Sequence, residues 1–170
     1  MFRRLFARLT GEPQRGQALF NLAVAEARPT HWFLEGGVPD TVNGRFAVLA
    51  TIVALITVRL ESAGPEGAEA TVALTERLVE SLDTEIREMG VGDPTLGKQV
   101  RRLVGSVGAR VERWRSVIGQ KDWGDEVQRS LDLDETVGAR AVAHDENALR
   151  NLWKRLSESS VEQLAEGRTA

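Results

Sequence analysis

Apolar residues recur every three or four positions along most of this 170-residue chain. This is the spacing of one face of an α-helix. The pattern predicts helices over residues 14–27, 43–60, 67–89 and 93–118, and shorter ones over 123–133 and 145–156. A capping-box pattern over residues 159–162 predicts one more short turn, which ends at Gly167. We therefore expect an all-α fold, a single compact domain of about six helices around a central apolar helix.

The segment from residue 43 to residue 60 supplies that central helix, because it is apolar on nearly every side. A helix without a polar face belongs in the middle of a fold, so we expect it to be largely buried. Its longest apolar stretch runs from Phe46 to Val58. That stretch is shorter than the roughly 20 residues of a membrane span, and it begins too late to be a secretory signal. The pattern is typical of a soluble chain.

Charge and cysteine content exclude several classes of function. The net charge is −3 and there is no cysteine. The charge gives no general attraction to nucleic acid, so we expect no DNA partner. The missing cysteine excludes disulfides, thiolate metal sites and a cysteine nucleophile. It also fits a reducing compartment, and we expect a cytoplasmic protein, with a peripheral place at the inner face of the cytoplasmic membrane as the alternative.

The first 13 residues form a short basic amphipathic segment ahead of a helical body over residues 14–170. Within residues 2–9 the apolar side chains fall on one helical face and the arginines lie largely on the other. These residues are Phe2, Leu5, Phe6 and Leu9, and Arg3, Arg4 and Arg8. Two interpretations stay open for this segment, contact with a membrane surface and a frayed or docked terminus.

No combination of residues indicates catalysis, a metal or a cofactor. Residues 92–98 are similar to a phosphate-binding loop, but a helix precedes them and Gln99 replaces the hydroxyl that would hold magnesium. We interpret them as a helix–helix turn, with Asp93 as the N-cap of the next helix. His31 and His144 lie far apart and neither has a metal-ligand spacing. Boundary histidines are the favoured interpretation, and a paired His–carboxylate site stays open.

Charged faces on two successive helices predict a partly paired surface. The helix over residues 67–89 is acidic outside, and the next helix carries a basic stripe from Lys98 to Arg115. Adjacent antiparallel helices of this kind would face complementary charge, so we favour a solvated, partly paired face over an RNA site. Trp32 and Phe33 lie beside the first loop, where both a core position and an exposed anchor are open.

Two loops rich in Gly, Pro and Asp, residues 35–46 and 88–101, separate these helices. The first contains Val38-Pro39-Asp40-Thr41 and Gly44-Arg45-Phe46, and the second contains Met89-Gly90-Val91-Gly92-Asp93 with Gly97-Lys98 and Val100-Arg101. Together they resemble the signature of the ubiquinol–cytochrome c chaperone family. The chain departs from the family by having Trp32 and Phe33 where tyrosines are usual, and by lacking a histidine in the apolar helix.

The resemblance implies a non-catalytic assembly factor of the bacterial form. Such a protein binds newly made cytochrome b while the ubiquinol–cytochrome c reductase complex is assembled, and further expected partners are a small co-chaperone and the ribosome. We expect Asp40 and Arg45 to have structural roles in the first loop. The alternative is a membrane-surface adaptor or another helical protein-interaction module. The expected client-binding residues are Trp32, Phe33, Val38, Pro39, Asp40, Arg45, Val91, Lys98 and Arg101.

Overall fold

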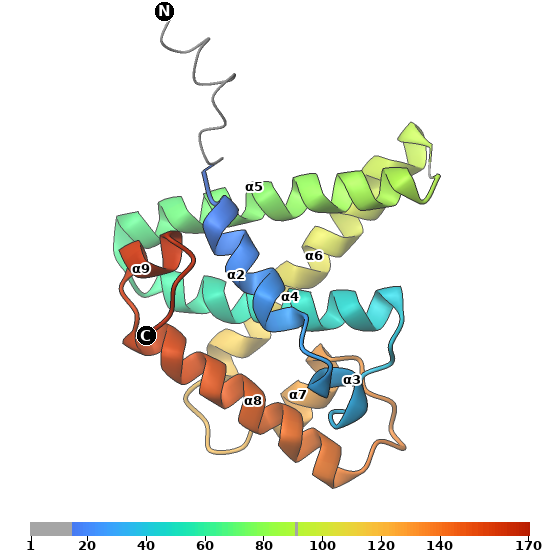
Figure 1. Cartoon of the computed structure of the whole chain (residues 1–170), viewed down its shortest axis with the longest axis vertical. Coiled ribbons are helices and arrows are strands. Elements are labelled where there is room, and N and C mark those ends of the chain that lie inside the picture. Colours follow the sequence, from blue (N-terminus) through green and yellow to red (C-terminus); the bar gives the residue numbers. More distant parts are fainter. Residues whose placement is uncertain (1–14, 91) are drawn as a thin grey trace, which may run out of the picture.

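The structure is a computed structural model that describes residues 15–90 and 92–170 (Figure 1). Within these residues every regular element is a helix. This confirms the all-α fold. The short basic segment over residues 1–13 lies outside the described residues. The helices are α2 (Gln17–Ala27), α3 (His31–Leu34), α4 (Val42–Glu61), α5 (Gly64–Glu88), α6 (Asp93–Val117), α7 (Gly124–Ser130), α8 (Ala139–Glu158) and α9 (Val161–Ala165).

Helix α4 is the centre of the fold, as its sequence predicts. It packs against α2, α5, α6, α7 and α8, and Val48, Ile52 and Leu55 are fully buried. The helix has 20 residues, so it extends beyond the apolar stretch from Phe46 to Val58 at both ends. Of the described helices it alone is long and apolar enough to cross a membrane, with a mean hydropathy of 1.5, yet 61% of that window is buried inside the protein.

The helices α5 and α6 form a long hairpin whose tip extends past α4 (Figure 1). Near the tip a small cluster of Ile86, Leu96 and Val100 joins the two helices. One expectation here is wrong. The cap of α6 is Gly92, whose φ of −71° and ψ of 155° are extended, so Asp93 is the first helical residue and not the N-cap.

The basic stripe of α6 pairs with several elements. Arg115 bonds Glu61 at the end of α4 through two nitrogens, 2.9 and 2.7 Å, and Arg113 bonds Glu126 of α7 at 2.9 Å. Arg110 is buried and donates twice to the carbonyl oxygen of Ser130, at 3.0 and 2.8 Å. Burial lowers the pKa of Arg110, with the Asp132 carboxylate acting in the opposite direction. These bonds connect α6 to the α7 end of the molecule.

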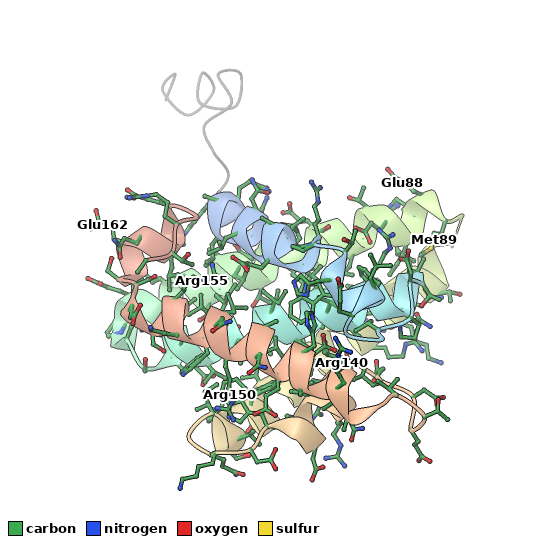
Figure 2. All side chains as sticks on the ribbon, turned by 60° about the horizontal axis from the view of Figure 1, so that its bottom comes forward. Glu88, Met89, Arg140, Arg150, Arg155 and Glu162 are labelled. Atoms are coloured by element: carbon green, nitrogen blue, oxygen red, sulfur yellow. The ribbon has the colours of Figure 1, made fainter. Side chains whose placement is uncertain are left out.

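The C-terminal third is more helical than the sequence predicts. Helix α8 begins at Ala139, six residues before the expected start, and the last capping box is formed by Ser160 and Gln163, one residue later than expected. Figure 2 shows Arg140, Arg150 and Arg155 along α8. Arg155 bonds both carboxylate oxygens of Glu26 in α2, at 2.7 and 2.8 Å, so α8 is tied to α2.

Candidate functional site

The first signature loop folds tightly onto the start of α4. Thr41 caps the helix, since its hydroxyl accepts from the backbone N–H of Gly44 at 3.1 Å. A Cβ on Gly44 would lie 1.9 Å from the carbonyl oxygen of Pro39, so only glycine fits. Asp40 accepts from Nε of Arg45 at 2.8 Å. This exposed ion pair links the loop to the first turn of α4, and the structural roles expected for the two residues stay predictions.

Three adjoining cavities lie along the less buried side of the first half of α4. The central cavity has about 370 Å³ and lies between α4, α5 and α6. A cavity of about 250 Å³ continues it toward α2 and α3 and shares Arg45 and Leu49 with it, and another of about 450 Å³ continues it toward α7 and shares Phe46 and Arg102. We call this surface the α4 groove. The residues that line its central part are Val42, Asn43, Arg45, Phe46, Leu49, Leu78, Ser81, Leu82, Glu85, Ile86, Met89, Gln99, Arg102 and Leu103.

The α4 groove has an apolar floor and a charged rim. Val42 and Met89, from the two signature loops, line it with exposed fractions of 66% and 59%. Figure 2 shows Met89 beside Glu88 at the end of the hairpin. Arg102 has no ion-pair partner among the described residues, and the Arg45 guanidinium lies 5.5 Å from the ring centroid of Phe33. The exposed Glu85 also lines the groove, so its rim carries both signs of charge. An apolar hollow with large exposed side chains and a charged rim is typical of a surface that binds another chain.

The expected client-binding residues divide between this surface and the core. Trp32 and Val38 are buried, and the indole N–H of Trp32 donates to the carbonyl of Glu26 at 3.1 Å. The expectation that these two lie on the surface is corrected, because the short helix α3 turns Trp32 inward and Val38 packs under the loop. Phe33 is half-buried and lines the α2 side of the α4 groove.

The other expected residues are less informative. Pro39, Asp40 and Arg45 are exposed, and of these only Arg45 lines the α4 groove. Lys98 and Arg101 are exposed on α6 and line none of the three cavities. The neighbouring Arg102 lines the α4 groove instead. Val91 lies outside the described residues. The sequence reasoning missed Phe46, Leu49 and Met89, although the i, i+3 spacing of the first two places them on one face of α4.

A cluster of titratable groups lies between α3 and α8. Nδ1 of His31 and Nε2 of His144 are 3.0 Å apart, and burial lowers the pKa of His31, as does the neighbouring His144. Asp145 is fully buried, its two carboxylate oxygens have no hydrogen-bond partner, and burial raises its pKa to about 7. A Cβ on Gly36 would lie 1.9 Å from Oδ1 of Asp145, so this carboxyl packs directly on the first signature loop.

Neither the histidine pair nor residues 92–98 forms the metal or nucleotide site that the sequence brought into question. Two histidines at this distance make one hydrogen bond, and no group of three or more His, Cys, Asp or Glu side chains in the described part could hold a metal ion. Residues 92–98 do not form a phosphate cradle, since α5 precedes them and Lys98 lies within α6. Of the described features, the α4 groove is therefore the candidate functional site.

Comparison with known proteins agrees with this description. A model of the ubiquinol-cytochrome C chaperone family matches residues 34–168. The crystal structure of the Cbp3 homolog from Brucella abortus has the same fold, with a TM-score of 0.72 and 24% sequence identity over 98% of this chain and 94% of that one. The comparison with curated proteins found no match.

Proposed function

Because the chain belongs to the ubiquinol-cytochrome C chaperone family, we propose that it is a non-catalytic assembly factor for ubiquinol–cytochrome c reductase and that its α4 groove holds newly made cytochrome b. The observation that carries this proposal is the position of the groove. The two signature loops, far apart in the sequence, meet at one apolar hollow on the central helix.

The chemistry of the α4 groove suits an apolar segment with polar ends. Phe46 and Leu49 are only half-buried in the free protein, and covering them removes apolar surface from water at about 25 cal/mol per Å². Arg45 and Arg102 at the rim can donate to carboxylates or free carbonyl groups at the ends of such a segment. An apolar helix laid in a groove is a recurring mode of recognition.

The finer parts of this proposal rest on the family alone. They are a small co-chaperone, a contact with the ribosome, and a cytoplasmic location that is peripheral at the inner face of the membrane. The second candidate, a membrane-surface adaptor, is favoured by the basic amphipathic sequence of residues 2–9. The two candidates differ in what they require, a groove that captures cytochrome b or an N-terminal segment that binds lipid.

The test uses exposed residues, so that the fold is not disturbed. Val42→Asp with Met89→Asp places two carboxylates in the α4 groove. The control Val72→Asp places one carboxylate on α5, at a residue that is 55% exposed and outside the groove. We expect the double variant to lose crosslinking to newly made cytochrome b and to lower the amount of assembled complex. The control variant should behave as the unchanged protein.

Equal capture by the double variant and the control would remove the α4 groove from the proposal. A deletion strain with normal cytochrome b content and normal ubiquinol oxidation would overturn the assembly function itself. Loss of function on removing residues 2–9, with capture in the groove unimpaired, would favour the membrane adaptor.

A further inference from the structure

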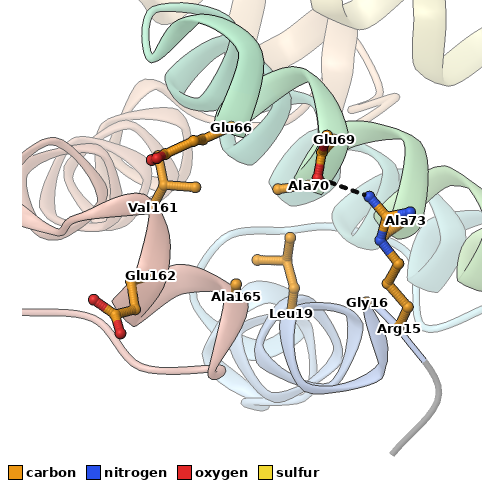
Figure 3. Close-up of a pocket in the computed structure, with 10 residues that line it drawn as sticks. All are labelled: Arg15, Gly16, Leu19, Glu66, Glu69, Ala70, Ala73, Val161, Glu162 and Ala165. Atoms are coloured by element: carbon orange, nitrogen blue, oxygen red, sulfur yellow. Dashed lines mark hydrogen bonds and ion pairs between the residues drawn. The ribbon is translucent and has the colours of Figure 1, made fainter.

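Asp145 differs from the other carboxylates of the described chain in its surroundings. Figure 3 shows a more usual case, with Glu66, Glu69 and Glu162 exposed around the hollow where α2, α5 and α9 meet, and Arg15 donating to Glu69 at 3.2 Å. Asp145 is fully buried, and neither of its oxygens has a hydrogen-bond partner among the described residues. Burial of this kind disfavours the charged form, so the proton on Asp145 affects whatever packs on the carboxyl.

The first signature loop packs directly on this carboxyl. A Cβ on Gly36 would lie 1.9 Å from Oδ1 of Asp145, so the backbone of the loop itself covers the acid. The N–H of Gly36 donates to the carbonyl oxygen of His31 at 2.9 Å, which joins this part of the loop to α3. Gly37 follows with a φ of +76°, and two adjacent glycines give the backbone freedom to shift at this point.

Helix α3 connects the carboxyl to the α4 groove. On one side His31 contacts His144, the residue before Asp145, at 3.0 Å. On the other side Phe33 lines the α2 side of the groove, and the guanidinium of Arg45 lies 5.5 Å from its ring centroid. Because α3 has only four residues, His31 and Phe33 belong to the same turn. A shift of α3 against α8 therefore moves the edge of the groove as well.

The described charged groups around α8 do not compensate an ionised Asp145. Burial is the cause that raises the pKa of Asp145 to about 7. Near His31, the carboxylates of Glu35 and Glu26 act to raise its pKa, and Glu26 is itself bonded to Arg155. The remaining groups on α4, α7 and α8 are bonded elsewhere or exposed. They are Arg45 with Asp40, Arg59 with the carbonyl oxygens of Leu156 and Ser159, Glu61 with Arg115, Glu126 with Arg113, Glu146 with Arg150, and the exposed Asp125, Arg129 and Arg140.

The acid and the histidines respond to pH in opposite directions. Because the pKa of Asp145 is raised from 3.8, its contribution to holding the loop is fully present below that value and is lost as the pH rises through about 7. The pKa of His31 is lowered from 6.5, so its contribution is lost as the pH falls below 6.5. A substitution that removes one of the two effects is therefore needed to observe the other.

We propose that the protonated Asp145 and the histidine pair form a latch that holds α3 and the first signature loop against α8, and that ionisation of Asp145 releases the latch and loosens the Phe33 edge of the α4 groove. The charged acid gains water when Gly36 moves off it, whereas the neutral acid does not need to. Released α3 takes Phe33 from its place beside Arg45, so the groove loses part of its apolar wall. The effect on the client rests on the function proposed for the groove, in which the latched form holds cytochrome b more tightly.

The absence of cysteine allows two spin labels to be placed in the full chain. Leu34→Cys, at a residue of α3 that is 77% exposed, and Lys154→Cys, at an exposed residue of α8, report the distance across the latch. At pH 7.5 we expect the unchanged protein to show a second, longer distance. Asp145→Asn cannot ionise and should raise the ratio of the short to the long distance several-fold. The difference between the two proteins should shrink at pH 5.

A reference pair and two measurements in the groove complete the test. Labels on Val72→Cys and Lys154→Cys leave α3 out, so they should give one distance throughout and show that Asp145→Asn is folded. Nuclear Overhauser contacts between the Phe33 ring and the Arg45 side chain should be several-fold stronger in Asp145→Asn at pH 7.5. Crosslinking to newly made cytochrome b should rise with them.

Equal distance distributions in the unchanged protein and in Asp145→Asn at pH 7.5 would overturn the latch, as would a difference of the same size at pH 5. A change of distance that leaves the contacts between Phe33 and Arg45 unaltered would overturn the connection to the groove. Altered ring contacts with unaltered crosslinking would overturn the effect on the client. If the groove is not the client site, crosslinking does not respond to Val42→Asp with Met89→Asp, whereas the distances and ring contacts still report the latch.

Discussion

The imidazole rings of His31 and His144, 113 residues apart in the sequence, meet with Nδ1 and Nε2 3.0 Å apart. The pair can share one proton, because a second would place two N–H donors against each other. The ring of His31 also lies 4.5 Å from that of Trp32, between centroids. Protonation at this point therefore acts on the contact that holds α3, and with it the first signature loop, against α8.

We predict that Asp145→Asn stabilises the protein at neutral pH. The pKa of Asp145 rises from 3.8 to about 7 on folding, so the folded state favours the protonated acid. The contribution of the protonated Asp145 to the free energy of unfolding is fully present below pH 4, and it is lost as the pH rises toward 7. Asparagine stays neutral, so the free energy of unfolding at pH 7.5 should rise by about 1 to 4 kcal/mol.

Urea unfolding at several pH values between 4 and 8 measures this effect. The difference between the variant and the unchanged protein should shrink toward zero at pH 4. A difference that is constant across this range would show that the carboxyl is ionised, and hence solvated, in the folded protein.

We predict that His144→Gln raises the pKa of His31 part of the way to its usual 6.5. Burial is the larger cause of the lowered pKa and remains in the variant, whereas the charge of His144 is removed, and Glu35 and Glu26 continue to raise the value. A lowered pKa in the folded state means that stability is lost as the pH falls below 6.5. The variant should lose less stability than the unchanged protein between pH 6.5 and 5.

The chain has only two histidines, so their ring protons can be followed directly by NMR. The measurement is best made with Asp145→Asn present in both proteins, because the ionisation of Asp145 acts on stability in the opposite direction. A pKa of His31 that does not change in His144→Gln would contradict the contact between the rings.

We predict that Gly44→Ala destabilises the protein by more than about 2 kcal/mol, because its Cβ would overlap the carbonyl of Pro39. Loss of the cap in Thr41→Ala should cost about 1 kcal/mol. The control is Gly108→Ala in α6, where the space is open. That change should stabilise by roughly 0.8 kcal/mol, since alanine is the better helix former. Similar midpoints for Gly44→Ala and Gly108→Ala in thermal unfolding would refute the close contact.

We predict that calorimetry with magnesium-ATP detects no micromolar binding. The turn before Lys98 follows a helix and lacks the hydroxyl that a phosphate-binding loop uses for magnesium. Micromolar affinity that Lys98→Ala abolishes would show that the exposed start of α6 binds nucleotide after all.

Local sequence patterns predict the elements of this protein well and their surfaces less well. The all-round apolar character of α4 is enough to place it at the centre, since no other position would cover it. The same reasoning does not predict that the side chains of Phe46 and Leu49 remain partly exposed, because their exposure depends on how α5 and α6 pack around α4. Trp32 was ambiguous for a similar reason, as a four-residue helix leaves no periodicity to read.

The cluster between α3 and α8 could not be predicted from spacing. Rules for paired histidines compare residues three or four positions apart on one helix, and His31 and His144 come from different helices. Asp145 looks like an ordinary exposed residue in a polar helix until α3 and Gly36 cover it. The exact N-cap residue of α6 could not be predicted either, because Gly92 can adopt the extended conformation of a cap as well as Asp93 can.

The composition of α4 has a consequence for how this chain is synthesised. The helix ends at Glu61, and the last turn of α6, which covers it, ends at Val117. At about 5–20 residues per second, roughly 3 to 11 s pass between these two points on the ribosome. During that interval a segment apolar enough to enter a bilayer lacks the helix that covers it in the folded protein. The nascent chain thus carries, for several seconds, a segment that resembles a membrane span by length and composition.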